Sequence, residues 1–173
     1  LRVTFELQND IGLEMNLDQI LKKILVRTYQ FLNYDRGVIL LADGNGKLRP
    51  RVFKGRSKDD RPSVSRTLLR HITKEKRGVL SLDVLTDERF NAAESLMIQG
   101  VRSTMGVPIL HQNELLGVIL VDSSTATNAY KQKDLNLLSN IANRGAQFIK
   151  ISRMAKKIET DAITRERFQR LLS

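Results

Sequence analysis

The sequence of 173 residues contains no cysteine and no tryptophan, and it has only three prolines and nine aromatic residues. The lack of cysteine excludes disulfide bonds, thiolate metal sites, cysteine nucleophiles and thioether-linked cofactors. Nothing in the composition points to an oxidising compartment, so we expect a cytoplasmic protein.

Long apolar runs are missing as well. The longest, at residues 38–42 and 118–121, are four or five residues long, whereas a membrane-spanning helix needs about 20. We therefore expect no membrane partner. The first residue is not methionine and the first ten do not have the order of a signal peptide, which suggests a piece of a longer protein.

What the chain has in excess is positive charge, with a net of +10. Residues 47–77 hold twelve basic and three acidic side chains, and residues 144–173 hold eight basic and three acidic. Such blocks either bind nucleic acid or another anionic partner, or form an ordinary solvated surface. Because Phe53 is the one aromatic residue in the first block, base stacking is not favoured and nucleic acid is the less expected partner.

Apolar residues recur at spacings of three and four in the first 32 residues and again from Lys131 onward. The first stretch predicts helices at about 1–14 and 17–32, the second of them capped by Asn16 with Gln19 at its third position. The last stretch predicts a helix of about 40 residues that extends beyond any core on which it could pack.

The middle of the chain predicts strands. Residues 36–43 and 47–55 form one hairpin and residues 103–110 and 115–124 another, the second turning at Gln112-Asn113. Pro50 places its strand at a sheet edge, and the nearly continuous apolar run of 115–124 places that strand in the centre.

Between the hairpins we expect a helix capped by Ser63 or Ser65, a strand at 79–84 and a helix at 92–99 that ends at Gly100. The order of elements predicts an α+β domain in which helices pack on an antiparallel sheet.

Residues 13–152 resemble a GAF domain. The most specific parts are D-R-x-x-I-L-L at 35–41, S-x-x-x-V-P-I at 103–109 and L-L-G-V-I-L-V-D-S at 115–123. The resemblance implies an α/β sandwich with a six-stranded antiparallel sheet that covers a ligand pocket, and terminal helices that pass the state of the domain to an output.

The resemblance also implies a domain organisation: an N-terminal signalling helix at 1–14, the GAF domain at 15–152 and a linker helix at 153–173. The stretch DERFNAAESLMIQGVRS is similar to GAF domains that follow a forkhead-associated domain. The ending ITRERFQRLLS looks like the helix entering a class III nucleotidyl cyclase, and TDAIT is similar to the entry of a diguanylate cyclase. We expect a non-catalytic module whose missing output domain is one of these cyclases, an adenylate cyclase first.

Several ligands known in GAF domains leave residue requirements that can be checked. Covalent bilins and free methionine sulfoxide reduction need cysteine, which is absent. The Asn-Lys-Phe-Asp-Glu signature of cyclic-nucleotide binding cannot be placed, although that class stays an alternative. His71 and His111 are not spaced as haem or metal ligands, so no cofactor or metal is expected.

For a small ligand we expect residues from the third strand, the following loop and the second hairpin, where an arginine near an aromatic ring could hold a planar or anionic molecule. They are Asp83, Arg89, Phe90, Asn91, Arg102, Ser103 and Met105. The alternative is that these residues only pack and cap, with Asp83, Asp87 and Glu88 forming a turn before the next helix.

Our main hypothesis is a homodimer of such modules, joined through the terminal helices across a two-fold axis. The expected seam consists of Leu7, Ile11, Ile141, Gly145, Phe148, Ile151, Ala155 and Ile158. Its few apolar residues would make a marginal coiled coil, weak enough to shift between two packings.

Overall fold

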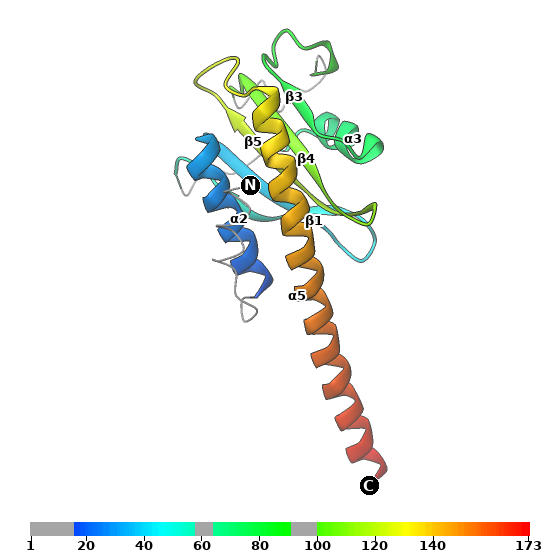
Figure 1. The fold of residues 1–173 in the computed structure, drawn as a ribbon. Helices are drawn as coiled ribbons and strands as arrows, with labels where there is room; N and C mark the ends of the chain where they lie inside the picture. The colour runs from blue at the N-terminus through cyan, green and yellow to red at the C-terminus, as the bar shows by residue number, and fades with distance from the viewer. Residues whose placement is uncertain (1–15, 58–63, 91–99) are drawn as a thin grey trace.

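A computed structural model describes residues 16–57, 64–90 and 100–173 (Figure 1). The described strands form one sheet in the order β2-β1-β5-β4-β3, and every neighbouring pair is antiparallel. The elements are α2 (Leu17–Leu32), β1 (Arg36–Ala42), β2 (Leu48–Lys54), α3 (Arg66–Glu75), β3 (Val79–Ser81), the 3-10 helix η1 (Glu88–Phe90), β4 (Ser103–His111), β5 (Glu114–Ser123) and α5 (Gln132–Leu172).

The α+β prediction is confirmed, but the sheet has five described strands and not six. The strand expected at 79–84 also ends early, at Ser81. Asp83 causes this, because its carboxylate accepts the N–H of Leu85 at 3.1 Å and its carbonyl accepts the N–H of Asp87 at 3.1 Å. These bonds turn the chain away from the sheet. The helices expected at 1–14 and 92–99 lie outside the described residues.

Local signals fixed the ends of the other elements as predicted. Asn16 Oδ1 accepts the N–H of Gln19 at 2.9 Å, and Gln19 Oε1 accepts the N–H of Asn16 at 3.1 Å, a complete capping box. Of the two serines expected to cap α3, Ser65 does so by accepting the N–H of Leu68, and Ser63 lies outside the described residues. Gln112 and Asn113 both have positive φ, as a two-residue hairpin turn requires.

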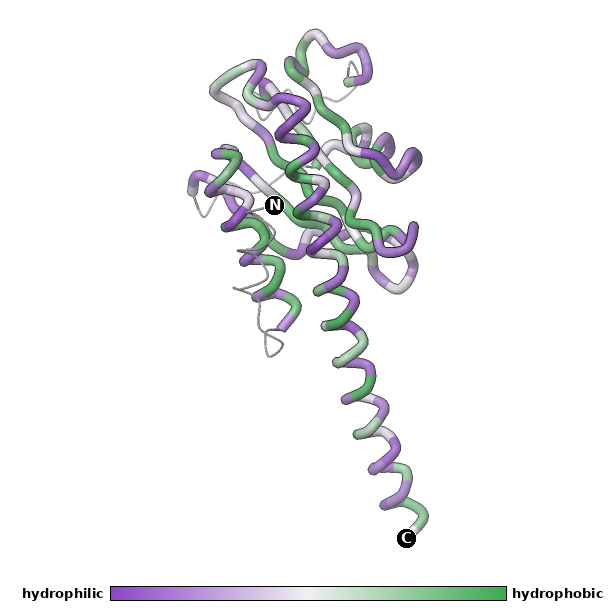
Figure 2. The backbone as a smooth tube through the Cα atoms, viewed as in Figure 1, coloured by the Kyte–Doolittle hydropathy of each residue, from purple (hydrophilic) through white to green (hydrophobic). Residues whose placement is uncertain are grey.

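The central strand β5 is buried on both faces, as its apolar run predicted. Ile119 and Val121 point into a core shared with α2 and α5, whereas Val118 and Leu120 point into a core shared with α3. The helices therefore form two layers around the sheet, and the most hydrophobic part of the chain follows the strands (Figure 2). This three-layer arrangement leaves β2, with Pro50, at one edge.

The helix α5 has a packed half and an exposed half. Ile141, Gly145 and Ile149 are buried, and a Cβ at Gly145 would lie 2.9 Å from Cδ1 of Ile24, so α2 can approach closely only at a glycine. From Ile151 the apolar side chains are exposed, for example 69% at Ile158. The helix continues without a break to Leu172, well away from the sheet (Figure 1).

Gly117 tests how tightly β5 is packed. A Cβ there would overlap the carbonyl oxygen of Leu40 and lie 2.8 Å from Cδ2 of Leu41 on the neighbouring strand. We expect Gly117→Ala to lower the free energy of unfolding by about 1–3 kcal/mol, because a backbone atom cannot give way as a side chain can. Urea unfolding measures this. Gly44→Ala, at an open turn with no atom within 4 Å, is the control and should change stability by less than about 0.5 kcal/mol.

Candidate functional site

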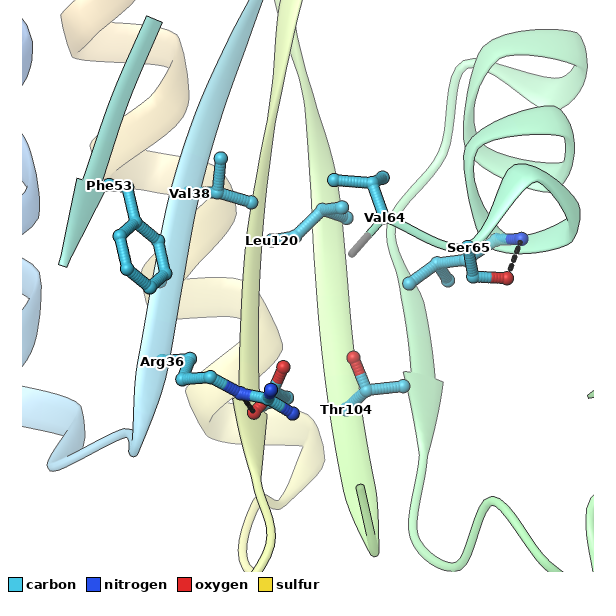
Figure 3. A pocket seen from close by; sticks show the side chains of 10 residues that line it. Arg36, Val38, Phe53, Val64, Ser65, Thr104 and Leu120 are labelled. Atoms are coloured by element: carbon cyan, nitrogen blue, oxygen red, sulfur yellow. Dashed lines mark hydrogen bonds and ion pairs between the residues drawn. The ribbon is translucent and has the colours of Figure 1, made fainter. Parts of the chain in front are cut away.

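A hollow opens on the α3 side of the sheet, at the end where β1 begins and β5 ends (Figure 3). Its enclosed space is about 20 Å³, enough for about one water-sized group, and the rest is open to solvent. Five structural elements and the residues just before α3 line it: Arg36, Gly37, Val38, Phe53, Val64, Ser65, Leu68, Thr104, Leu120 and Asp122. Ligand pockets usually measure about 300–1,000 Å³, so a ligand here would insert only a small group or would require the lining side chains to move apart.

An ion pair forms the polar end of the hollow. Arg36 is the first residue of β1 and lies opposite Asp122 in the β1–β5 register. Its Nε donates to Asp122 Oδ1 at 3.1 Å, and the two side chains are only 9% and 18% exposed. Because water screens a buried pair little, Arg36 and Asp122 present a strong local dipole to anything that enters.

The rest of the hollow is mainly apolar. Val38 and Leu120 come from the sheet, and Val64 faces them from the segment before α3 (Figure 3). The two hydroxyls already have partners: Ser65 Oγ accepts from Leu68, and Thr104 Oγ1 donates to the carbonyl of Val121 at 3.1 Å. Among the described residues of the lining there is no histidine, lysine or cysteine, so this described surface has one polar end and no nucleophile paired with a base.

Asp35, beside Arg36, holds this end of the sheet together. Its Oδ2 accepts a hydrogen bond from the N–H of Ser124 at 2.8 Å and forms an ion pair with Nη2 of Arg56 at 2.7 Å. Burial alone would raise the pKa of Asp35, but the hydrogen bonds from Arg56 and Ser124 outweigh it and hold the pKa below its ordinary value. The carboxylate thus connects the start of β1 to the chain that follows β2 and β5.

The expected ligand residues near η1 are engaged in hydrogen bonds and packing contacts within the domain. Asp83 forms the turn described above, as the alternative of capping predicted. Arg89 donates to Asp87 at 2.9 and 2.6 Å, and these bonds lower the pKa of Asp87 to about 2. Phe90 is fully buried in the α3-side core, with its ring 6.5 Å from that of His71.

The expected residues on β4, Ser103 and Met105, lie on the face of the sheet opposite the hollow, and Arg102 precedes the strand. Met105 is buried in the core with α2 and α5, on the other side from the hollow. Ser103 is buried and its hydroxyl donates to the carbonyl of Ala126 at 3.0 Å, whereas Arg102 is exposed. None of these three, nor Asp83, Arg89 or Phe90, lines the hollow. Asn91 lies outside the described residues.

The sequence carried a signal for the residues that do line the hollow. Arg36 and Asp122 belong to the D-R-x-x-I-L-L and L-L-G-V-I-L-V-D-S motifs, which we used only to identify the resemblance. Thr104 is adjacent to Ser103, and strand alternation alone puts the two on opposite faces. Pairing the two motifs in register would have placed Arg36 beside Asp122.

The residues expected to form the dimer seam fall into two groups, one packed inside the domain and one exposed. Ile141 and Gly145 are buried inside the single chain, and Phe148 packs partly against the same core, so these three are used within the domain. Ile151 and Ile158 are 50% and 69% exposed, and Ala155 between them is exposed. Leu7 and Ile11 lie outside the described residues.

Two further kinds of site are absent from the ranges that the structure describes. There, no three histidine or acidic side chains are grouped as metal ligands. None of the described helices is both long and apolar enough to cross a membrane.

Comparisons with known proteins agree on one family. The sequence profile of the GAF domain matches residues 16–149. No protein of curated function matches the chain.

Many solved structures are similar to this fold. A GAF domain region from Geobacter sulfurreducens PCA is 27% identical with a TM-score of 0.61, covering 87% of this chain and 97% of its own. The GAF domain of a phosphoenolpyruvate-protein phosphotransferase from Coxiella burnetii is 16% identical, with a TM-score of 0.71 and coverages of 90% and 95%. A type II free methionine-R-sulfoxide reductase from Thermoplasma acidophilum is 23% identical, with a TM-score of 0.60 and coverages of 76% and 89%.

The Asp35 network predicts a pH dependence. The folded pKa of Asp35 lies below its ordinary value of 3.8, so its contribution to stability is complete above that value and is lost as the pH falls through the folded pKa. At pH 7, Asp35→Asn should lower the free energy of unfolding by about 1–2 kcal/mol, the low end for charged hydrogen bonds because Arg56 is half exposed.

Urea unfolding at several pH values tests this. The difference between the wild type and Asp35→Asn should shrink as the pH falls below about 4. Glu88→Gln, which changes an exposed carboxylate, is the control. A difference that stays constant down to pH 2.5 would contradict the role of the Asp35 charge.

Proposed function

The chain belongs to the GAF domain family of regulatory and sensory modules, and from this premise we propose that it is a non-catalytic input module that binds a small ligand in the hollow and dimerises along α5. The sensory role comes from the family match over residues 16–149. The ligand, the dimer, the cyclase output and the cytoplasmic location are the parts that we propose.

The position of the hollow relative to α5 is the observation that carries this proposal. Thr104 and Leu120 line the hollow on one face of the sheet. Met105 and Val121, the next residues on the same two strands, lie on the other face in the core that contains α5. Because strand side chains alternate, a ligand that moves β4 or β5 also moves the support of α5.

The polar end and the apolar walls indicate the kind of ligand. A compact molecule with an apolar body would fill the space between Val38, Val64 and Leu120. A polar group at one end would lie near the Arg36–Asp122 pair, which can offer both a donor and an acceptor. Cyclic nucleotides remain one candidate class, to be tested beside small metabolites.

Dimerisation is supported by the exposed half of α5. Ile151 and Ile158 are seven residues apart, so they lie on one side of the helix, and Leu172 continues this stripe. Ile149, which packs on the core, lies about 200° around the helix from Ile151. A second helix can therefore run along the stripe without displacing α2 or the sheet.

We propose a nucleotidyl cyclase as the output, on the resemblance of residues 163–173 alone. The last turns of α5, which include Phe168 and Leu172, are exposed and would continue toward that domain.

Filling the hollow tests the ligand site. Val64 is half-buried at the hollow, so Val64→Phe should occupy the space without entering the core. In a thermal-shift screen of cyclic nucleotides and small metabolites, any compound that raises the Tm of the wild type should lose its effect on this variant, because the site is blocked.

Val26→Phe is the matched control, since Val26 is 46% exposed on α2 and does not line the hollow. It should keep the full response. A compound that stabilises Val64→Phe as much as the wild type would contradict binding in the hollow.

The dimer is tested by a charge on the stripe. Ile158→Asp should weaken self-association by at least about tenfold in sedimentation equilibrium, because an aspartate would be buried without a partner. Ile163→Asp is the control: Ile163 is 44% exposed on the same helix but lies about 140° from Ile158 around its axis. A wild-type monomer at high concentration, or an equal effect of both variants, would refute the α5 interface.

A further inference from the structure

The helix α3 carries a row of positive side chains on its outer surface. Arg66, Arg70 and Lys74 follow one another at intervals of four residues, so they lie on one side of the helix over about 12 Å. All three are exposed, and Arg77, just beyond the helix, is exposed too. We call Arg66, Arg70, Lys74 and Arg77 the α3 basic row.

The basic residues of β2 and the loop after it behave differently, although they belong to the same block of sequence. Arg49 pairs with Asp43 at 2.9 Å and Arg51 pairs with Asp18 at 3.0 Å. Arg56 pairs with Asp35 at 2.7 Å. No member of the α3 basic row has an ion pair with a carboxylate among the described residues.

This row is unfavourable for the isolated helix. Like charges four residues apart repel, and Arg66 lies in the first turn, where the helix dipole favours an acidic residue. The first turn of α3 contains no acidic residue at all. Where a sequence breaks local rules without a gain in the fold, the gain is expected in function.

We infer that the α3 basic row is a docking surface for an acidic helical segment of a partner protein. Carboxylates one turn apart on such a segment repeat at the same interval of about 6 Å as the cations of the row. Two helices lying side by side could then pair charge with charge along both rows. The inference is independent of the hollow and of the α5 stripe.

Other anions fit the surface less well. A bilayer would gain no apolar contact, because the apolar side of α3 is used in the core, with Leu68 and Ile72 almost fully buried. Unpaired bases would find no ring to stack on, since the half-buried His71 packs against Phe90. A protein that makes about six to ten phosphate contacts on a duplex needs more cations than the four of the row. The basic strand β2 cannot extend the row, because it lies at the opposite edge of the sheet from β3 and its Arg49 and Arg51 are paired.

Two synthetic peptides of identical composition test the match. Both are alanine-rich helices of about 20 residues with four glutamates. In one peptide the glutamates lie one turn apart on a single face, and in the other they are dispersed around the helix. At low salt we expect the aligned peptide to bind the wild type at least fivefold more tightly, because only it can pair with the whole row.

Variants assign the binding to α3. The triple variant R66Q/R70Q/K74Q should bind the aligned peptide at least tenfold more weakly than the wild type does. The circular dichroism spectrum of this variant should match that of the wild type, since glutamine is a good helix former. K47Q/R49Q/R51Q removes the same number of positive charges from β2 and its turn and should change the affinity by less than twofold.

Three results would overturn the inference. Equal affinity for the two peptides, or equal loss in the two triple variants, would mean that only net charge matters. Tighter row-dependent binding of a 20-base-pair DNA duplex, or of phosphatidylserine vesicles, would assign the surface to a different partner.

Discussion

The burial of β5 on both faces is the constraint on which the rest of this structure depends. One face of the strand supplies the core for α2 and α5 and the other supplies the core for α3. A strand in this position carries polar residues only near its ends, as at Asp122 and Ser123, the last two residues of β5. The two polar ends of β1 and β5 therefore meet at one edge of the core, and the hollow forms where they meet.

The sequence predicted the parts of the fold that local chemistry determines. Asn16 and Gln19 predict the start of α2, and Gln112-Asn113 predict a tight hairpin. The apolar run after Glu114 predicts a central strand. The number and length of the strands depended on competition between strand pairing and other hydrogen-bonded conformations of the same residues. Asp83 offers the backbone a turn in place of three more residues of β3, and periodicity in a window of six residues does not show which of the two forms.

The candidate site was harder to predict because it depends on which face of its strand each side chain lies on and on the register between neighbouring strands. Ser103 and Met105 were chosen as neighbours of a pocket, but Thr104 between them has the orientation that reaches it. Register places Arg36 opposite Asp122 from 86 residues away in sequence. Composition and periodicity do not predict a pairing between residues so far apart in the sequence. Aligning the two motifs as neighbouring strands would have predicted it.

The same geometry limits how strongly a ligand could control α5. A ligand in the hollow can shift an equilibrium between two packings only by its difference in affinity for them. A shift from 1:99 to 99:1 needs a difference of about 5.5 kcal/mol, which is more than a few apolar contacts with Val38 and Leu120 would supply. Control through β4 and β5 therefore requires that the two packings of α5 be nearly equal in energy beforehand. In the proposed dimer, the stripe on the exposed half of α5 would meet this requirement, because it contains Ala155 and Arg165 among larger apolar residues, a composition that favours a weak interface. A strong coiled coil at this position would make the module insensitive to its ligand.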